Sequence, residues 1–250
     1  MNTSRRYFLK VAGLSSFALA AGAAKGGAAE YEDYPEGLKA QRWAMVIDTR
    51  RFKSPEDIKP IVEACHKAHN VPDITGPKEI KWIWDDTFEH AFASDPSPML
   101  PKSIESRRFF LLCNHCTNPS CVRVCPAGAT YKTPGGLVAI DYHRCVGCRF
   151  CMAACPYGSR SFNFMDPRPH VKHLNPEFPT RMRGVVEKCT FCAERLEKGK
   201  MPACVEASKG AIIFGDLNDP KSIVRKVLAS NFSIRRKPDL GTDPGVYYII

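Results

Sequence analysis

Twelve cysteines stand at short, regular intervals that suit metal ligation. The first complete group has the spacing C-x2-C-x4-C-x3-C-P and contains Cys113, Cys116, Cys121 and Cys125. The second has the spacing C-x2-C-x2-C-x3-C-P and contains Cys145, Cys148, Cys151 and Cys155. The second spacing is typical of bacterial ferredoxins, in which three thiolates hold one four-iron cluster and the cysteine before proline ligates its neighbour. The chemistry of such groups is single-electron transfer.

The crossed-ligand rule assigns these eight cysteines to two [4Fe-4S] clusters. The first cluster is predicted to be held by Cys113, Cys116, Cys121 and Cys155. The second is predicted to be held by Cys145, Cys148, Cys151 and Cys125.

A third group, C-x2-C-x11-C, supplies only Cys189, Cys192 and Cys204. Ser208 stands where a fourth cysteine would fall, and the remaining cysteine of the chain is Cys65. By the same rule, Cys65 is the surviving fourth cysteine of an N-terminal motif, and Ser208 marks a cluster that is missing. The third [4Fe-4S] cluster is therefore predicted to be held by Cys189, Cys192, Cys204 and Cys65.

Two other uses of cysteine compete with this interpretation. A zinc-binding interaction module is possible, because C-x2-C pairs also bind zinc. A disulfide framework is possible in an exported protein. Neither accounts for runs of four cysteines that end in Cys-Pro, so clusters are favoured.

The elements that must position these thiols can be predicted in part. Residues 43–49 are predicted to form a strand. Ser54 and Pro55 then favour the start of a helix. Ile58, Ile61 and Cys65 follow at the spacing of one helical face, so Cys65 is expected to point inward.

Further elements are shorter. We expect a hairpin from 129–132 and 137–141, a helix over 189–198 that stops at Gly199, a strand over 211–214 and a helix over 220–228. Residues 71–108 are predicted to form a loop-rich insertion, whose tryptophans are expected to pack rather than relay electrons. The apolar C-terminal run over 240–250 is either a closing strand or a docking tail.

Other candidate residues flank the cysteines. His66, His69 and His115 are expected to form hydrogen bonds or lie at the surface rather than ligate metal. Four cations adjoin ligands and would favour the reduced clusters if they lie close, or otherwise are simply solvated: Arg123, Arg144, Arg149 and Lys188. The sequence shows no P-loop, nucleophile elbow or dinucleotide fingerprint.

The N-terminus predicts export. Arg5 and Arg6 precede an apolar stretch over 11–24, which is typical of a twin-arginine leader. This stretch is shorter than the roughly 20 residues that span a bilayer. Export of a folded protein would reconcile thiolate ligands with an extracytoplasmic destination. The net charge of +10 is better explained by the leader and by compensation of negative clusters than by nucleic-acid binding.

Several segments resemble the four-cluster electron-transfer subunits of dimethyl-sulfoxide-reductase and polysulfide-reductase type complexes. They are residues 113–126, 145–158, 185–192, 202–206 and 213–220. More narrowly, the three-cluster cysteine set and residues 43–50 and 65–72 are similar to iron–sulfur subunits of DsrMKJOP-type complexes of sulfur metabolism. This resemblance implies an electron-transfer subunit, without a substrate site of its own, between an integral membrane quinone-interacting subunit and a periplasmic multihaem cytochrome c in a hetero-oligomeric membrane complex.

The expected fold class is α+β, with two interleaved bacterial-ferredoxin-like units and loop-rich insertions. The expected regions are a leader (1–29), half of an outer unit plus an insertion (30–108), an inner two-cluster unit (109–160), the rest of the outer unit (161–230) and a docking tail (231–250). The alternative function is the electron-transfer subunit of a periplasmic molybdopterin reductase of polysulfide-reductase type.

Overall fold

A computed structural model describes residues 37–93 and 99–250. The predicted leader lies outside these residues. The helices are α2 (Pro55–His69), α3 (Phe88–Ala91), α4 (Lys102–Glu105), α5 (Ser120–Arg123), α6 (Phe150–Ala153), α7 (Ala193–Glu197), α8 (Ala203–Ala207) and α9 (Ile223–Ser230). The strands are β1 (Trp43–Asp48), β2 (Ile83–Asp86), β3 (Phe109–Leu112), β4 (Thr130–Lys132), β5 (Val138–Ile140), β6 (Ser161–Phe162), β7 (Val186–Glu187), β8 (Ile212–Asp216), β9 (Ser233–Ile234) and β10 (Val246–Ile249). This mixture agrees with the predicted α+β class.

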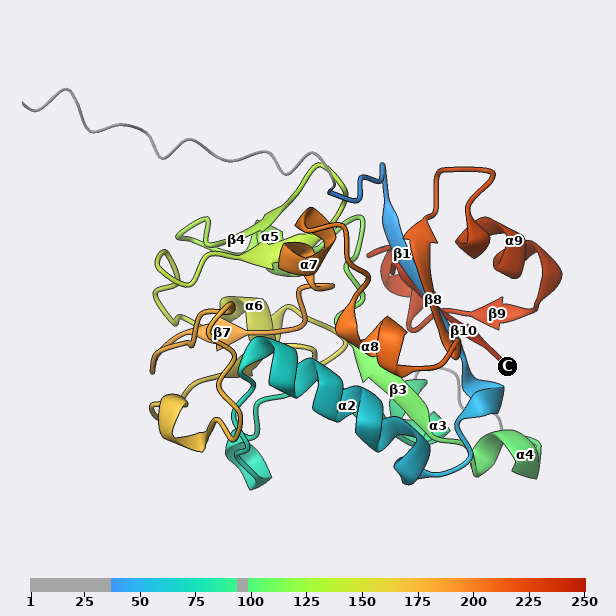
Figure 1. Ribbon diagram of the computed structural model, residues 1–250, viewed down its shortest axis with the longest axis horizontal. Helices are drawn as coiled ribbons and strands as arrows, with labels where there is room; N and C mark the ends of the chain where they lie inside the picture. The colour runs from blue at the N-terminus through green and yellow to red at the C-terminus, as the bar shows by residue number, and fades with distance from the viewer. Residues whose placement is uncertain (1–36, 94–98) are drawn as a thin grey trace, which may run out of the picture. The chain divides into compact units, whose positions relative to one another are not determined.

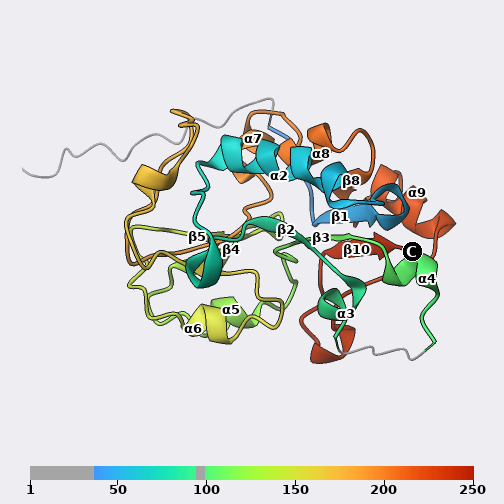
Figure 2. The same ribbon diagram turned by 90° about the horizontal axis from the view of Figure 1, so that it is seen from below.

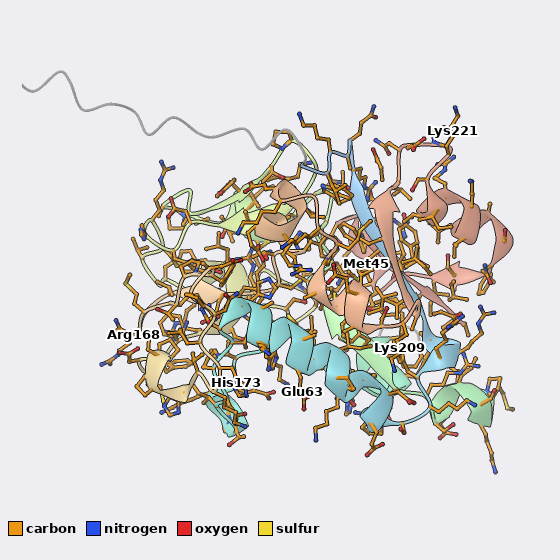
Figure 3. All side chains as sticks on the ribbon, in the orientation of Figure 1. Met45, Glu63, Arg168, His173, Lys209 and Lys221 are labelled. Carbon is orange, nitrogen blue, oxygen red and sulfur yellow. The ribbon has the colours of Figure 1, made fainter. Side chains whose placement is uncertain are left out.

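A four-stranded sheet in the order β8-β1-β10-β9 anchors one side of the described unit. β1 pairs in parallel with β10 and antiparallel with β8. Ala44 and Val46 face α9, whereas Met45 and Ile47 belong to the main core, as the alternation of side chains along a strand requires. Met45 accordingly lies among crowded side chains, while Lys221 projects at the edge (Figure 3).

The helix α2 begins and ends where local chemistry dictates. Ser54 and Asp57 form a capping box, and Pro55 occupies the first turn. Asn70 ends the helix in the left-handed conformation, with φ of 52°. Ile58, Ile61 and Cys65 are buried on one face, as predicted. The helix packs on α8 and runs along it in Figure 1.

The remaining strands form three two-stranded ladders, β2-β3, β4-β5 and β6-β7. The β4-β5 ladder is the predicted hairpin. The short helices α5 and α6 pack together, away from the four-stranded sheet, as both Figure 1 and Figure 2 show. None of the described helices has the length and apolarity needed to cross a bilayer.

The structure decides between or refines three expectations about local structure. The C-terminal run is β10, the strand closing the sheet, and Val246 and Tyr248 have no exposed surface, so Val246–Ile249 cannot be a docking tail. The helix predicted over 220–228 is instead Ile223–Ser230, because Ser222 caps it. The insertion over 71–108 contains the short elements β2, α3 and α4 between its loops, and β2 pairs with β3, which follows the insertion.

A buried ion pair ties the segment before β7 to α2. The Arg181 guanidinium lies 2.7 Å from a Glu187 carboxylate oxygen, and both side chains are buried. Arg181 also donates to the carbonyls of His69 and Asn70 at the end of α2. Trp82 donates its indole N–H to the same Glu187 carboxylate at 2.8 Å, in keeping with a packing role. The network therefore joins the end of α2, the residue before β2, and β7.

Replacing Glu187 with alanine should lower the free energy of unfolding by about 3–5 kcal/mol, because it leaves the Arg181 charge buried without its partner. Anaerobic urea denaturation of the cluster-loaded protein would measure this. Asp166→Ala is the matched control, since it removes an exposed ion pair with Arg168 and should leave the midpoint unchanged. Equal midpoints for the two variants would contradict the role of the network.

Candidate metal centres

The structure brings the twelve cysteines together in three groups. We call site 1 the group Cys113, Cys116, Cys121 and Cys155. We call site 2 the group Cys125, Cys145, Cys148 and Cys151. We call site 3 the group Cys65, Cys189, Cys192 and Cys204. These are the same quartets that the crossed-ligand rule predicts from sequence.

Site 1 is formed by the loop after β3, the helix α5 and the chain after α6. Cys113, Cys116 and Cys121 are buried. Burial, followed by the proximity of the Cys113, Cys121 and Cys155 thiols, raises the pKa of Cys116 to about 12. Tyr157 closes the site by hydrogen bonding to Thr242, with 2.5 Å between the two hydroxyl oxygens. Four convergent thiols in a buried place are a donor set for a metal centre.

Site 2 is the most accessible of the three. Cys125, Cys145, Cys148 and Cys151 line one cavity, and Cys148 is the one exposed cysteine of the twelve. Burial would raise the pKa of Cys125, but the backbone amides of Thr130, Ala129 and Ala127 outweigh it and lower that pKa. These amides favour a thiolate, which is the form that ligates iron.

Gly147 shapes the loop that carries Cys145 and Cys148. Its φ is +69°, and an added Cβ would lie 2.2 Å from the carbonyl oxygen of Gly184. Glycine is therefore required both for the left-handed backbone and for the close approach of the second chain segment. The next left-handed residue, Arg149 with φ of 63°, is the N-cap of α6, the helix that carries Cys151.

Site 3 combines segments far apart in the sequence. Cys65 comes from α2, Cys189 and Cys192 precede α7, and Cys204 lies on α8. Burial and the neighbouring Cys189, Cys192 and Cys204 thiols raise the pKa of Cys65 far above its usual value. Backbone N–H groups already point at two of the sulfurs, from Phe191 to Cys189 and from Ala203 to Cys192, both at 3.4 Å.

The helix predicted over 189–198 begins only at Ala193. Phe191 and Cys192 are both left-handed, with φ of 54° and 53°. A continuous helix would carry the thiols along its axis, whereas this turn brings Cys189 and Cys192 toward Cys65 and Cys204. The convergence of ligands overrides the local helical preference.

The three sites follow one another in the order 3, 1, 2. The Cys113 thiol of site 1 is near enough to Cys189 of site 3 to raise the pKa of Cys189, after burial itself. Cys121 of site 1 and Cys151 of site 2 pack in one apolar cluster. Between sites 3 and 1, the His115 ring stacks on Phe191 with centroids 3.8 Å apart.

Buried polar side-chain atoms without hydrogen-bond partners next to the cysteines indicate whether iron–sulfur clusters fit these sites. The side-chain nitrogen and oxygen of Asn114 and the Thr190 hydroxyl are buried without hydrogen-bond partners among the described residues. Asn114 follows Cys113, and Thr190 follows Cys189. Such groups cost roughly 1–3 kcal/mol each when unsatisfied. The sulfurs of a cluster accept hydrogen bonds, so donors at these positions suit one.

The histidines beside the cysteines form hydrogen bonds, as expected for two of them. His115 Nδ1 accepts from the Val138 amide at 3.0 Å, so Nε2 is the nitrogen that donates to the Cys189 carbonyl at 3.1 Å. His69 Nε2 lies 2.7 Å from a Glu194 carboxylate oxygen. His69, Cys192 and Glu194 also form a compact group that could hold an ion, but Cys192 already belongs to site 3.

The cations next to the ligands differ in environment. Arg123, Arg144 and Arg149 are exposed, so water screens their charges, although the Arg149 guanidinium also lies over the rings of Phe162 and Phe164. Lys188 is buried, and its ammonium group donates to the carbonyls of Val138 and of Cys189. Sequence analysis missed Arg160, a buried arginine that touches Cys121. The one signal for Arg160 in the sequence is its position two residues after the Cys-Pro-Tyr-Gly run, which ends at Gly158.

Comparison with known proteins identifies the family. Residues 106–166 match the family described as a 4Fe-4S dicluster domain. The chain is 39% identical to Hdr-like menaquinol oxidoreductase iron-sulfur subunit 1 of Archaeoglobus fulgidus, over 98% of this chain and 97% of that protein. It is 36% identical to the iron-sulfur cluster-binding subunit of the menaquinone reductase of Nitratidesulfovibrio vulgaris, over 83% of this chain and 88% of that protein. The chain belongs to this family of iron–sulfur electron-transfer subunits.

A further relative belongs to an enzyme named for a sulfur compound. One subunit of the tetrathionate reductase of Salmonella typhimurium is 34% identical, over 100% of this chain and 89% of that protein. The family is therefore spread over complexes with different reactions, and membership alone fixes the cofactor type rather than the substrate of the complex.

Replacing Gly147 with alanine should disrupt site 2 alone, because the new methyl group would collide with the Gly184 carbonyl. Iron analysis of anaerobically prepared protein should show a loss of about four iron atoms per chain. Gly128→Ala is the matched control, since Gly128 has a similar φ of +60° but open space around its Cβ position. Equal iron in the two variants would show that the close contact does not matter.

Proposed function

We propose that this chain carries three [4Fe-4S] clusters, at sites 1, 2 and 3, and conducts single electrons through a membrane-associated redox complex. The observation that carries the proposal is the convergence of all twelve cysteines into three quartets. When bound, the clusters supply one-electron redox chemistry. The chain's own residues hold them, exclude water and set their potentials through hydrogen bonds, burial and charge.

The order of the sites suggests the path. Site 2 lies at one end with Cys148 exposed, and site 3 lies at the other end, beneath α2. Electrons would enter at one of these ends and leave at the other. The two halves of site 3 flank the inner motifs in sequence, which supports the proposal of two interleaved ferredoxin-like units.

The partners proposed for this electron-transfer subunit are an integral membrane quinone-interacting subunit and a periplasmic multihaem cytochrome c. Two relatives named for menaquinol or menaquinone support a quinone-linked complex. The cysteine set and the leader motif support the narrower proposal that the chain is DsrO, the iron–sulfur subunit of a DsrMKJOP-type complex at the periplasmic face of the membrane. It has no substrate site of its own in this proposal.

A second candidate is the electron-transfer subunit of a molybdopterin reductase. The similarity to subunits of the tetrathionate reductase of Salmonella typhimurium and the polysulfide reductase of Wolinella succinogenes favours it. Solubilising native membranes under nitrogen, capturing this chain and identifying its companions by mass spectrometry separates the two. A multihaem cytochrome with a polytopic quinone-interacting subunit is the expected result, and a molybdopterin-binding chain would instead support the reductase.

Iron analysis tests the number of clusters. Anaerobically prepared protein should contain about 12 iron atoms per chain and show the broad brown absorbance of iron–sulfur clusters. About eight iron atoms would remove site 3 from the account. A colourless protein containing zinc would support the interaction-module alternative, because zinc has no redox chemistry.

Single cysteine variants test site 3. Cys65→Ser and Cys204→Ser should weaken the same electron paramagnetic resonance signal, because both thiols belong to one quartet. Cys148→Ser, at site 2, is the control and should alter a different signal. Effects of Cys65 and Cys204 on two separate signals would refute the crossed pairing.

A further inference from the structure

The buried arginine Arg160 lies between sites 1 and 2. Only 5% of its surface is exposed. One guanidinium nitrogen lies 3.1 Å from the sulfur of Cys121, and the other terminal nitrogen donates to the Thr130 hydroxyl at 3.2 Å. Cys121 packs in the same cluster as Cys151 of site 2. The guanidinium is thus placed to interact with ligands of both sites.

No carboxylate forms an ion pair with Arg160 among residues 37–93 and 99–250. Arg181, which is as deeply buried, does have such a partner in Glu187. A buried charge without a counter-charge is strongly unfavourable. The cysteines of sites 1 and 2 lie beside Arg160, and as thiolates, the form that ligates iron, they would supply the missing negative charge.

We infer that Arg160 is the shared counter-charge of sites 1 and 2 and raises the reduction potentials of both clusters. This inference rests on the proposed function, because it requires clusters at these sites. Adding an electron makes a cluster more negative, so a fixed positive charge nearby stabilises the reduced form. In a buried setting this interaction is screened far less than at the surface. A single residue would then keep the potentials of two neighbouring clusters linked.

The test is a redox titration of anaerobically prepared, cluster-loaded protein followed by electron paramagnetic resonance. In Arg160→Gln, the ratio of reduced to oxidised cluster at a fixed potential should fall at least tenfold for two of the three clusters. This corresponds to about 59 mV for a one-electron couple. The third cluster, identified as site 3 by its loss in Cys65→Ser, should keep its midpoint.

Two further variants separate charge from structure. Arg160→Lys keeps the charge, so its midpoint potentials should lie within about 59 mV of the wild-type values, which corresponds to less than a tenfold change in the ratio of reduced to oxidised cluster. Arg144→Gln removes a charge next to Cys145 in sequence. The Arg144 side chain is 71% exposed, so this variant should leave all three midpoint potentials unchanged. Unshifted midpoints in Arg160→Gln, an equal shift of all three clusters, or a shift in Arg160→Lys as large as in Arg160→Gln would overturn the inference.

Iron content distinguishes failure of the inference from failure of the proposed function. Wild-type protein without iron would refute the clusters themselves. Full iron content with unshifted midpoints in Arg160→Gln would refute only the role of Arg160. If Arg160→Gln loses iron, Arg160→Lys decides: a loaded protein with unshifted midpoints supports the counter-charge, and loss of iron in both variants assigns Arg160 to the fold.

Discussion

The structure depends on the cost of gathering thiols in places from which water is excluded. Burial and mutual repulsion raise the pKa of thiols at sites 1 and 3, including Cys65 and Cys116. A bound metal centre would remove that cost, because its positive charge would stabilise the thiolates. Folding and cofactor binding are therefore expected to be coupled, and the framework around each site must aim its thiols at one point.

The framework meets this demand with short elements and unusual backbone conformations. Gly147, Arg149, Phe191 and Cys192 are all left-handed, and all lie within ligand motifs. One long element, α2, supplies the ligand that the local motif of site 3 lacks. The buried Arg181–Glu187 pair and the left-handed Asn70 fix the end of that helix, and so fix the position of Cys65 one turn before it. Packing far from the sulfurs thus determines the geometry of site 3.

Charge is distributed along the sites in a comparable way. Lys188 is buried beside Cys189 and donates to backbone carbonyls near sites 3 and 1, and Arg160 contacts site 1 near site 2. Each gap between neighbouring sites thus contains a buried cation. The three arginines that adjoin ligands only in sequence are exposed, where water screens them. Adjacency in sequence is a poor guide to electrostatic influence.

Sequence spacing predicts the grouping of Cys65 with Cys189, Cys192 and Cys204, because cysteine motifs follow a crossed rule and α2 has a clear apolar face, and the structure brings these thiols together. Sequence spacing is insufficient where tertiary constraints decide. The helical preference of residues 189–198 yields to the convergence of thiols, and the C-terminal apolar run is buried because it pairs with β1. Arg160 escaped prediction because its place two residues after the Cys-Pro-Tyr-Gly run does not distinguish a buried arginine from an exposed one.

Anomalous scattering at the iron edge, from crystals grown under nitrogen, tests the central claim most directly. The account predicts three separate iron peaks in the order of sites 3, 1 and 2, with the Cys65 sulfur at the first. Two peaks, or a Cys65 sulfur remote from any iron, would contradict it.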